Sequence, residues 1–374
     1  MPLSLVLGAV SCTQPASEQP QADSSQPQAE ISDGAGPQVV ASYSVLCDMA
    51  EQIAQNTVDV TCLIEAGQDP HTYSATPEDR RAIEEADLVL YNGYEFEPGI
   101  IQMVEAADTP APKVAVSEVA VTAPLLGEAH DHHHHAEGEA HDHHAEGEEH
   151  DHNHAEGEAH DHNHAEGEEH DHHAEGEAHA EEELVPDPHV WHDAENGIAL
   201  VRTVQSQLSE VSPENAELYE ANAEAMIAQL EELDTWIQAQ VDTVPASGRT
   251  IISTHDALGY YADAYGLEIE PALDSFSTEV RPSAANIKEL TEVVESKGIP
   301  SIFVESTSNP GLIETVSRET DIKVSQNPIY ADGLGESGTS AATYQGMLVT
   351  NTCTIVDGLG GVCDQAAAAA LLPT

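Results

Sequence analysis

A chain of 374 residues is long enough to form two domains with hydrophobic cores of their own. It carries 69 acidic residues against 10 Lys and Arg, a formal net charge of -59 that argues against nucleic acid as a partner, because phosphate binding requires clustered basic side chains. Such an acidic surface attracts cations and keeps a protein soluble, and a saline habitat would also account for it.

The first twelve residues are a short apolar segment that ends in small residues and Cys12. We interpret this segment, too short to span a bilayer, as an export signal. Its end resembles a bacterial lipoprotein signal, in which the cysteine is acylated, although Ala9 stands where Leu is usual. An ordinary secretory signal with an incidental cysteine is the alternative. Residues 13–37 are rich in Gln, Pro and Ser and predict a disordered tether, which suits an extracytoplasmic protein held at a membrane surface.

Four further cysteines follow in the chain. An even number in an exported protein indicates disulfides, and the pairing of sequence neighbours joins Cys47 to Cys62 and Cys353 to Cys363. Two other pairings and buried free thiols are the alternatives. The chain has no CxxC motif, which argues against a zinc site made of thiolates.

Residues 38–211 predict an α/β lobe with one long interruption. Residues 39–50 read as a strand entering a helix, and further apolar segments that read as strands occur at 58–64, 86–93 and 112–119. The helix that follows Thr76 is well signalled, because Pro77 takes its first position and acidic residues fill its first turn. Short apolar strands between helices predict a parallel sheet with helices on both faces.

Residues 127–183 break this pattern with a unit close to HDHNHAEGEA that recurs about every ten residues. The segment has almost no large apolar residues, so we expect a disordered, solvated loop. Such a tract can bind several zinc ions weakly, and a charged spacer that binds metal incidentally is the alternative. Its histidines are His130, His132, His133, His134, His135, His141, His143, His144, His150, His152, His154, His160, His162, His164, His170, His172, His173 and His179.

Residues 212–245 predict one long helix, with Ser212 as its N-cap, Pro213 at its first position and Pro245 as its stop. A helix of this length suits a strut between two lobes. Residues 246–374 return to alternating strands and helices and predict a second α/β lobe.

Outside the tract the chain has four histidines, and three lie near the ends of predicted strands or the start of a helix. These three are His71, His189 and His255. Ligands of open α/β sheets bind beyond the carboxyl ends of the strands, so loops from two lobes can meet at one cleft. Imidazole is a common zinc ligand, and a carboxylate often completes the set. Either Asp332 or Glu305 fits that role, and the residues alone do not choose between them.

Five segments, in this order, resemble the metal-binding receptors of bacterial ABC transporters for zinc and manganese, in particular the ZnuA/TroA-like (cluster A-I) substrate-binding proteins. They are DPHTYSATPEDRRAIEEADLVLYNG, DPHVWHD, STHDALGYYADAYGL, STEVRPSAANIKELTEVVESKGIPSIFVES and PIYADGLGESGTSAATYQGML. The resemblance runs from about residue 38 to 360. It implies two α/β lobes joined by one long rigid helix, with the metal held in the cleft between them.

The resemblance also implies the ligands His71 and His189 from the first lobe and His255 and Asp332 from the second. Glu305 resembles a family position near the cleft that supports the ligands without binding metal. Partners implied in the same way are a membrane permease and its ATPase. We expect a monomer that is a receptor and not an enzyme.

Three nearby residues are assigned accessory roles. Asp187 and Asp193 are candidates to orient ligating imidazoles. His192 stands where the family usually has a large apolar residue, and we interpret it as a residue of the cleft rim, with an alternate ligand as the other interpretation.

The expected metal is zinc, because three imidazoles and one carboxylate favour it, whereas harder oxygen ligands suit manganese. Manganese stays open as an alternative, since some relatives with three histidines are thought to take either metal. A zinc hydrolase is disfavoured because four protein ligands leave no position for water, and the chain lacks HExxH and GxSxG. An adhesin or zinc-storage protein that relies on the tract is a third possibility.

Overall fold

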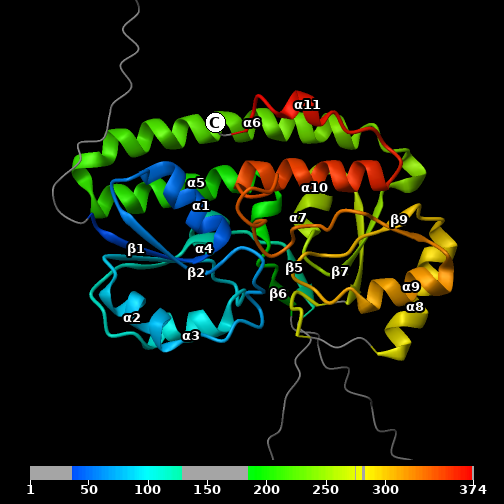
Figure 1. The fold of residues 1–374 in the computed structure, drawn as a ribbon, viewed down its shortest axis with the longest axis horizontal. Coiled ribbons are helices and arrows are strands. Elements are labelled where there is room, and N and C mark those ends of the chain that lie inside the picture. The colour runs from blue at the N-terminus through cyan, green and yellow to red at the C-terminus, as the bar shows by residue number, and fades with distance from the viewer. Residues whose placement is uncertain (1–35, 129–183, 274, 280–282, 373–374) are drawn as a thin grey trace, which may run out of the picture.

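The computed structural model describes residues 36–128, 184–273, 275–279 and 283–372, which form two α/β lobes side by side (Figure 1). The predicted signal with Cys12, nearly all of the predicted tether and the eighteen histidines of the tract lie outside these residues. Among the helices of the described residues, none is both long and apolar enough to cross a membrane.

The N-terminal lobe contains a parallel sheet with the strand order β2-β1-β3-β4. Its strands are β1 (Gln38–Tyr43), β2 (Asp59–Ile64), β3 (Leu88–Tyr91) and β4 (Lys113–Ala115). Its helices are α1 (Ser44–Ala54), α2 (Pro77–Glu85), α3 (Pro98–Ala106), α4 (Val116–Ala120) and α5 (Ala194–Val211). Figure 1 shows α2 and α3 on one side of the sheet and α1 and α5 on the other. The inner strand β1 is buried along almost its whole length, as expected when helices cover both faces.

The C-terminal lobe has two short parallel strand pairs. Its strands are β7 (Thr250–His255), β8 (Glu268–Leu273), β9 (Ser301–Ile302) and β10 (Lys323–Val324), paired as β7-β8 and β9-β10. Its helices are α7 (Gly259–Tyr265), α8 (Ala284–Lys297), α9 (Gly311–Thr320), α10 (Tyr344–Gly358) and α11 (Gln365–Ala368). A backbone hydrogen bond from Phe303 N to Ile252 O (2.9 Å) links the two pairs. The parallel sheets flanked by helices confirm the predicted fold class.

Local sequence signals account for the helix boundaries in two places. At the start of α2, the Thr76 hydroxyl accepts a hydrogen bond from Asp79 N and the Asp79 carboxylate accepts one from Thr76 N. Such a cap stabilises a helix by about 1 kcal/mol. Helix α7 ends at Tyr265 and is capped by Gly266, whose φ of 71° lies in the left-handed region that favours glycine.

The long helix α6 (Ala216–Val241) is shorter than the predicted span of 212–245 at both ends. The prediction that Ser212 caps it was wrong, because residues Pro213–Asn215 form a separate 3-10 turn. The Ser212 hydroxyl instead accepts a hydrogen bond from Asn215 Nδ2 (2.9 Å). With 26 residues, α6 is about 39 Å long and runs along both lobes (Figure 1).

A shared hydrophobic core packs α6 against helices of both lobes. This core combines buried residues from helices of both lobes, among them Leu46 of α1, Leu200 of α5, Leu230 of α6, Tyr261 of α7 and Met347 of α10. A second, smaller core lies between the C-terminal strands and helices α8 and α9. Close-packed interiors resist deformation, so a large hinge motion about α6 would have to disrupt the shared core.

A two-stranded antiparallel ribbon marks where the His-rich segment leaves the fold. It pairs β5 (Leu126–Glu128) with β6 (Leu184–Pro186). Residues 127 and 128, assigned to the disordered loop from their sequence, therefore belong to a strand, because their backbone groups pair with those of residues 185 and 184.

Two disulfides follow the pairing of sequence neighbours. Cys47 of α1 is bonded to Cys62 of β2, and Cys353 of α10 to Cys363 beyond its end, with sequence separations of 15 and 10. In the chain-entropy description, closing a loop of 15 residues stabilises a fold by about 3 kcal/mol. Disulfides are typical of exported proteins.

A buried carboxyl group in the N-terminal lobe makes stability depend on pH. Glu97 is fully buried, and its Oε1 accepts a hydrogen bond from Asn92 N (2.7 Å). Burial raises the pKa of Glu97 to about 7 from an ordinary value of 4.5. Between these two values the folded protein binds more protons than the unfolded chain, so the free energy of unfolding falls as pH rises through this window.

Replacing Glu97 with glutamine is therefore expected to flatten the pH dependence of stability. The uncharged amide oxygen can still accept the hydrogen bond from Asn92 N. Between pH 5 and pH 8 the free energy of unfolding of the variant should therefore fall by up to roughly 3 kcal/mol less than that of the parent protein. Urea unfolding of both proteins in the presence of a chelator measures this difference. An identical pH dependence in the two proteins would contradict the role assigned to Glu97.

Candidate metal centre

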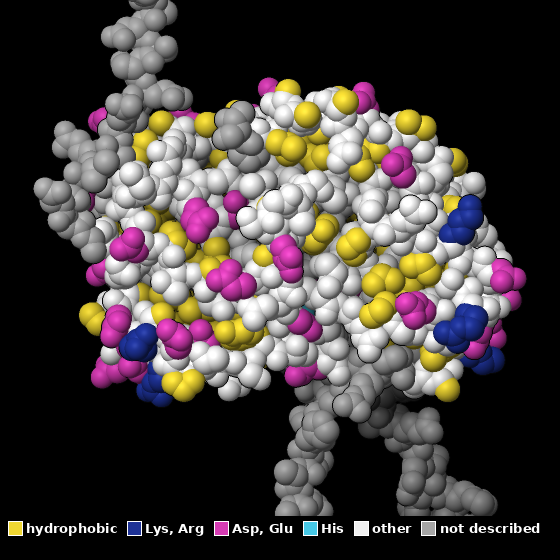
Figure 2. Space-filling view, viewed as in Figure 1, with side chains coloured by type: hydrophobic (Ala, Val, Ile, Leu, Met, Phe, Trp, Pro, Cys, Tyr) yellow, Lys and Arg dark blue, Asp and Glu magenta, His cyan; other side chains and the backbone are white. Residues whose placement is uncertain are grey.

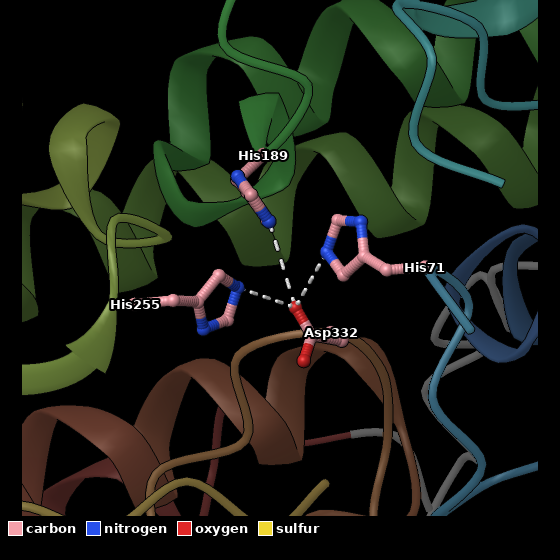
Figure 3. A group of neighbouring side chains, drawn as sticks. All are labelled: His71, His189, His255 and Asp332. Atoms are coloured by element: carbon pink, nitrogen blue, oxygen red, sulfur yellow. Dashed lines mark ion pairs between the residues drawn. The ribbon is translucent and has the colours of Figure 1, made fainter. Parts of the chain in front are cut away.

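Four buried side chains from both lobes converge on one point (Figure 3). His71 comes from the loop after β2, His189 precedes the 3-10 turn Val190–His192, His255 is the last residue of β7, and Asp332 lies in the loop after β10. Each offers one ligand atom, and these atoms all lie within 4.8 Å of one another. The structure thus brings together the three histidines that the sequence singled out and the aspartate that the family resemblance implied.

The four facing atoms have no other partners. Asp332 Oδ1 lies 3.5 Å from His71 Nε2, 3.5 Å from His189 Nε2 and 3.2 Å from His255 Nε2. All four atoms are buried, and none of them makes a hydrogen bond. Buried polar atoms are normally paired, so four unpaired ones aimed at a common point form an arrangement suited to a cation.

Carboxylates fix the orientation of two of the imidazoles. His189 Nδ1 lies 2.8 Å from Asp187 Oδ1, and His255 Nδ1 lies 2.6 Å from Glu305 Oε2. Each carboxylate accepts a hydrogen bond from the Nδ1–H group, which keeps the proton on Nδ1 and leaves the Nε2 lone pair directed at the common point. Glu305 therefore contacts the Nδ1 side of His255, whereas Asp332 lies on its Nε2 side, at the common point.

The charges of these groups are strongly coupled. Burial lowers the pKa of every imidazole, and in His71 this effect outweighs contact with Asp332, so its pKa lies below the ordinary value. In His189 and His255, hydrogen bonds and nearby carboxylates outweigh burial, so the pKa of His189 is raised and that of His255 is raised well above the ordinary value. A cation that binds through these nitrogens therefore competes with protons.

Asp332 shows the opposite balance. Burial raises the pKa of its carboxyl group, but the neighbouring imidazoles, His255 foremost, outweigh burial and hold that pKa well below its ordinary range. The carboxylate is therefore anionic at neutral pH, as a metal ligand must be.

Two accessory residues have other positions than expected. The Asp193 carboxylate caps α5 by accepting a hydrogen bond from Glu195 N (2.8 Å). Its contact is therefore with the helix backbone and not with a ligating imidazole. His192 is not a rim residue, because only 1% of its surface is exposed. Its Nε2 donates to Ala331 O (2.8 Å), which ties the first lobe to the residue before Asp332.

Phe96, an apolar neighbour of the site, was not predicted from the sequence. Its ring lies edge-on to those of His71 and His189, with centroid separations of 5.0 and 5.6 Å. Phe96 is fully buried in the loop between β3 and α3. A single aromatic residue in a loop has no distinctive sequence signal, so only the fold places it here.

The β5–β6 ribbon, whose strands flank the His-rich segment in the sequence, begins close to this site. Strand β6 ends one residue before Asp187, and Asp187 N donates to Leu125 O (2.8 Å) just before β5. The base of the β5–β6 ribbon is thus fixed beside the carboxylate that orients His189. On the face drawn in Figure 2, Asp and Glu side chains are widely scattered, whereas Lys and Arg side chains appear near its two ends.

The periplasmic family of zinc-uptake complex component A matches residues 39–358. Two similar relatives are the manganese-binding lipoprotein MntA of Halalkalibacterium halodurans and the manganese ABC transporter substrate-binding lipoprotein PsaA of Streptococcus mitis. MntA is 29% identical over 87% of this chain and 90% of its own length, and PsaA is 28% identical over 86% and 88%.

A solved structure has the same fold. The periplasmic zinc-binding protein TroA from Treponema pallidum superposes with a TM-score of 0.68 at 26% sequence identity. The superposition covers 87% of this chain and 99% of TroA, so the similarity extends over both lobes.

Proposed function

This chain belongs to the periplasmic zinc-uptake component A family of metal-binding ABC-transporter receptors, and on that premise we propose that the metal it captures is zinc. The observation that carries the proposal is the buried set of four unpaired ligand atoms, His71 Nε2, His189 Nε2, His255 Nε2 and Asp332 Oδ1. Three nitrogens and one oxygen form the tetrahedral set that zinc prefers.

A manganese receptor, or one for both metals, is the second candidate. The names of MntA and PsaA favour it, since both are described as manganese proteins. The donor set favours zinc, because manganese prefers more oxygen ligands. The metal-free full chain should be dialysed against zinc and manganese together and its metal content measured. Because the His-rich tract can also bind zinc, the same measurement is made on Asp332→Asn, and we expect the full chain to retain about one more zinc per chain than this variant and little manganese. Preferential retention of manganese would overturn the zinc assignment.

The proposed mechanism is capture and release. Zinc enters between the lobes, displaces protons and is held by groups from both sides. Because α6 and the shared core resist bending, the lobes are expected to tilt only slightly. A membrane permease then receives the ion outside the cytoplasm, and its ATPase supplies the energy. Acylation of Cys12 would keep this receptor, which we take to be a monomer, at the membrane surface.

A receptor fits the site better than an enzyme does. Catalytic zinc usually has three protein ligands and an open position for water. Here four buried protein atoms face one point, and all four residues are almost inaccessible to solvent.

Deletion of residues 129–183 separates a receptor from a storage protein. The structure sets this range, because Glu128 and Leu184 pair at the end of the β5–β6 ribbon and a short Gly-Ser linker can join them. We expect the deletion variant to keep one tight zinc site and to lose the weaker binding of the parent protein. Titration calorimetry of both proteins measures this. Loss of tight binding from the deletion variant would favour zinc storage by the tract.

A further inference from the structure

The two oxygens of the Asp332 carboxylate have different surroundings. Oδ1 has no hydrogen bond and faces the three Nε2 atoms at 3.2 to 3.5 Å. Oδ2 accepts a hydrogen bond of 2.5 Å from the hydroxyl of Thr307. The carboxylate is fully buried, and Thr307 is half-buried. One oxygen is therefore free for a metal while the other is already engaged.

We infer that Thr307 keeps Asp332 as a one-oxygen ligand and thereby favours zinc over manganese. The inference rests on the proposed function and names a determinant of its metal preference. Zinc is satisfied by four ligands in a tetrahedron, which three imidazoles and one oxygen supply. Manganese prefers a larger number of oxygen ligands. A carboxylate that binds through both oxygens would help to meet that preference, and the Thr307 hydroxyl competes for the second oxygen.

The backbone holds the hydroxyl and the carboxylate in register. Ser306 N donates to Ile329 O (2.8 Å), and Glu305 forms an isolated parallel bridge with Ile329. The loop with Thr307 is thus paired with the segment that leads into Asp332. The short contact between the two side chains follows from this pairing.

Hydrogen bonds also hold the backbone just before and just after Asp332. Ala331 O accepts a hydrogen bond from His192 Nε2, and Leu334 N donates to the hydroxyl of Ser44 (2.9 Å). Both partners belong to the first lobe. Since the backbone around Asp332 is held in this way, turning its carboxylate to present both oxygens to a metal would weaken the Thr307 hydrogen bond.

The test compares Thr307→Val, which removes the hydroxyl at nearly constant shape, with Thr307→Ser, which keeps it. Zinc and manganese affinities of the full-length variants are measured by competition, and Co²⁺ serves as a spectroscopic probe of coordination geometry. Thr307→Val should reduce the preference for zinc over manganese by about tenfold or more. Its visible Co²⁺ bands should weaken, because tetrahedral Co²⁺ absorbs more strongly than Co²⁺ with more ligands. Thr307→Ser should resemble the parent protein in both measurements.

Other outcomes overturn the inference in distinguishable ways. If Thr307→Val leaves the metal preference and the Co²⁺ spectrum unchanged, or weakens both metals equally, Thr307 only supports the loop. Should Thr307→Val fail to fold, Thr307→Ala takes its place with the same expectations. If the parent protein itself binds no zinc, the proposed function fails before Thr307 is tested.

Discussion

Replacing Asp332 with asparagine is expected to lower zinc affinity by more than about 100-fold. Substitution of a residue that only orients a metal ligand typically costs about 10- to 100-fold, so substitution of a ligand should cost more. Asp332 supplies the one carboxylate among the four facing groups, and its oxygen lies closest to His255 Nε2, at 3.2 Å. Asparagine retains the shape and an acceptor for the Thr307 hydroxyl, but it removes the negative charge that offsets the cation. Competition with a chromophoric chelator measures the affinity.

The matched control is Asp193→Asn. Asp193 lies four residues after His189 in the sequence and caps α5, a role that asparagine fills about as well. Its substitution should leave zinc affinity unchanged. A loss of less than about tenfold in Asp332→Asn, or equal losses in both variants, would contradict the assignment of Asp332 as a ligand.

Replacing Glu305 with glutamine is expected to reduce zinc affinity by about 10- to 100-fold, although Glu305 faces away from the common point. Its Oε2 accepts from His255 Nδ1, and its Oε1 accepts from the backbone N–H groups of Thr254 and His255. A glutamine that keeps the backbone hydrogen bonds presents its NH₂ group to Nδ1. The imidazole then carries its proton on Nε2, where it blocks a metal.

Glu314→Gln is the control for this variant, because Glu314 is exposed on α9 and its loss removes the same charge. Affinities are measured by the same competition assay, after circular dichroism has shown that both variants are folded. Parent-like affinity in Glu305→Gln would show that the hydrogen bond to His255 Nδ1 does not control metal binding.

The sequence predicted the parts of this protein that local chemistry determines. Thr76, Pro77 and Asp79 form their cap from neighbours in the chain, so the start of α2 could be predicted. The histidines were recognisable because only one other occurs outside the tract and because they lie near the ends of predicted strands or the start of a helix. Ser212 shows where this approach fails, since its hydroxyl bonds to the Asn215 side chain and not to the first turn of a helix.

The choice between Asp332 and Glu305 depended on tertiary structure. Both carboxylates follow short apolar segments, and nothing in their immediate sequence distinguishes them. Resemblance to the family selected Asp332, and the fold supplies the physical reason, because Glu305 is occupied behind His255. Thr307 carried no signal, since its partner lies 25 residues away and is brought near by backbone pairing.

Anomalous diffraction at the zinc edge, from crystals of the full-length chain loaded with one equivalent of zinc, tests the central claim most directly. We expect one peak about 2.0 to 2.2 Å from His71 Nε2, His189 Nε2, His255 Nε2 and Asp332 Oδ1. Zinc bound elsewhere, with these four atoms left without metal, would contradict the account.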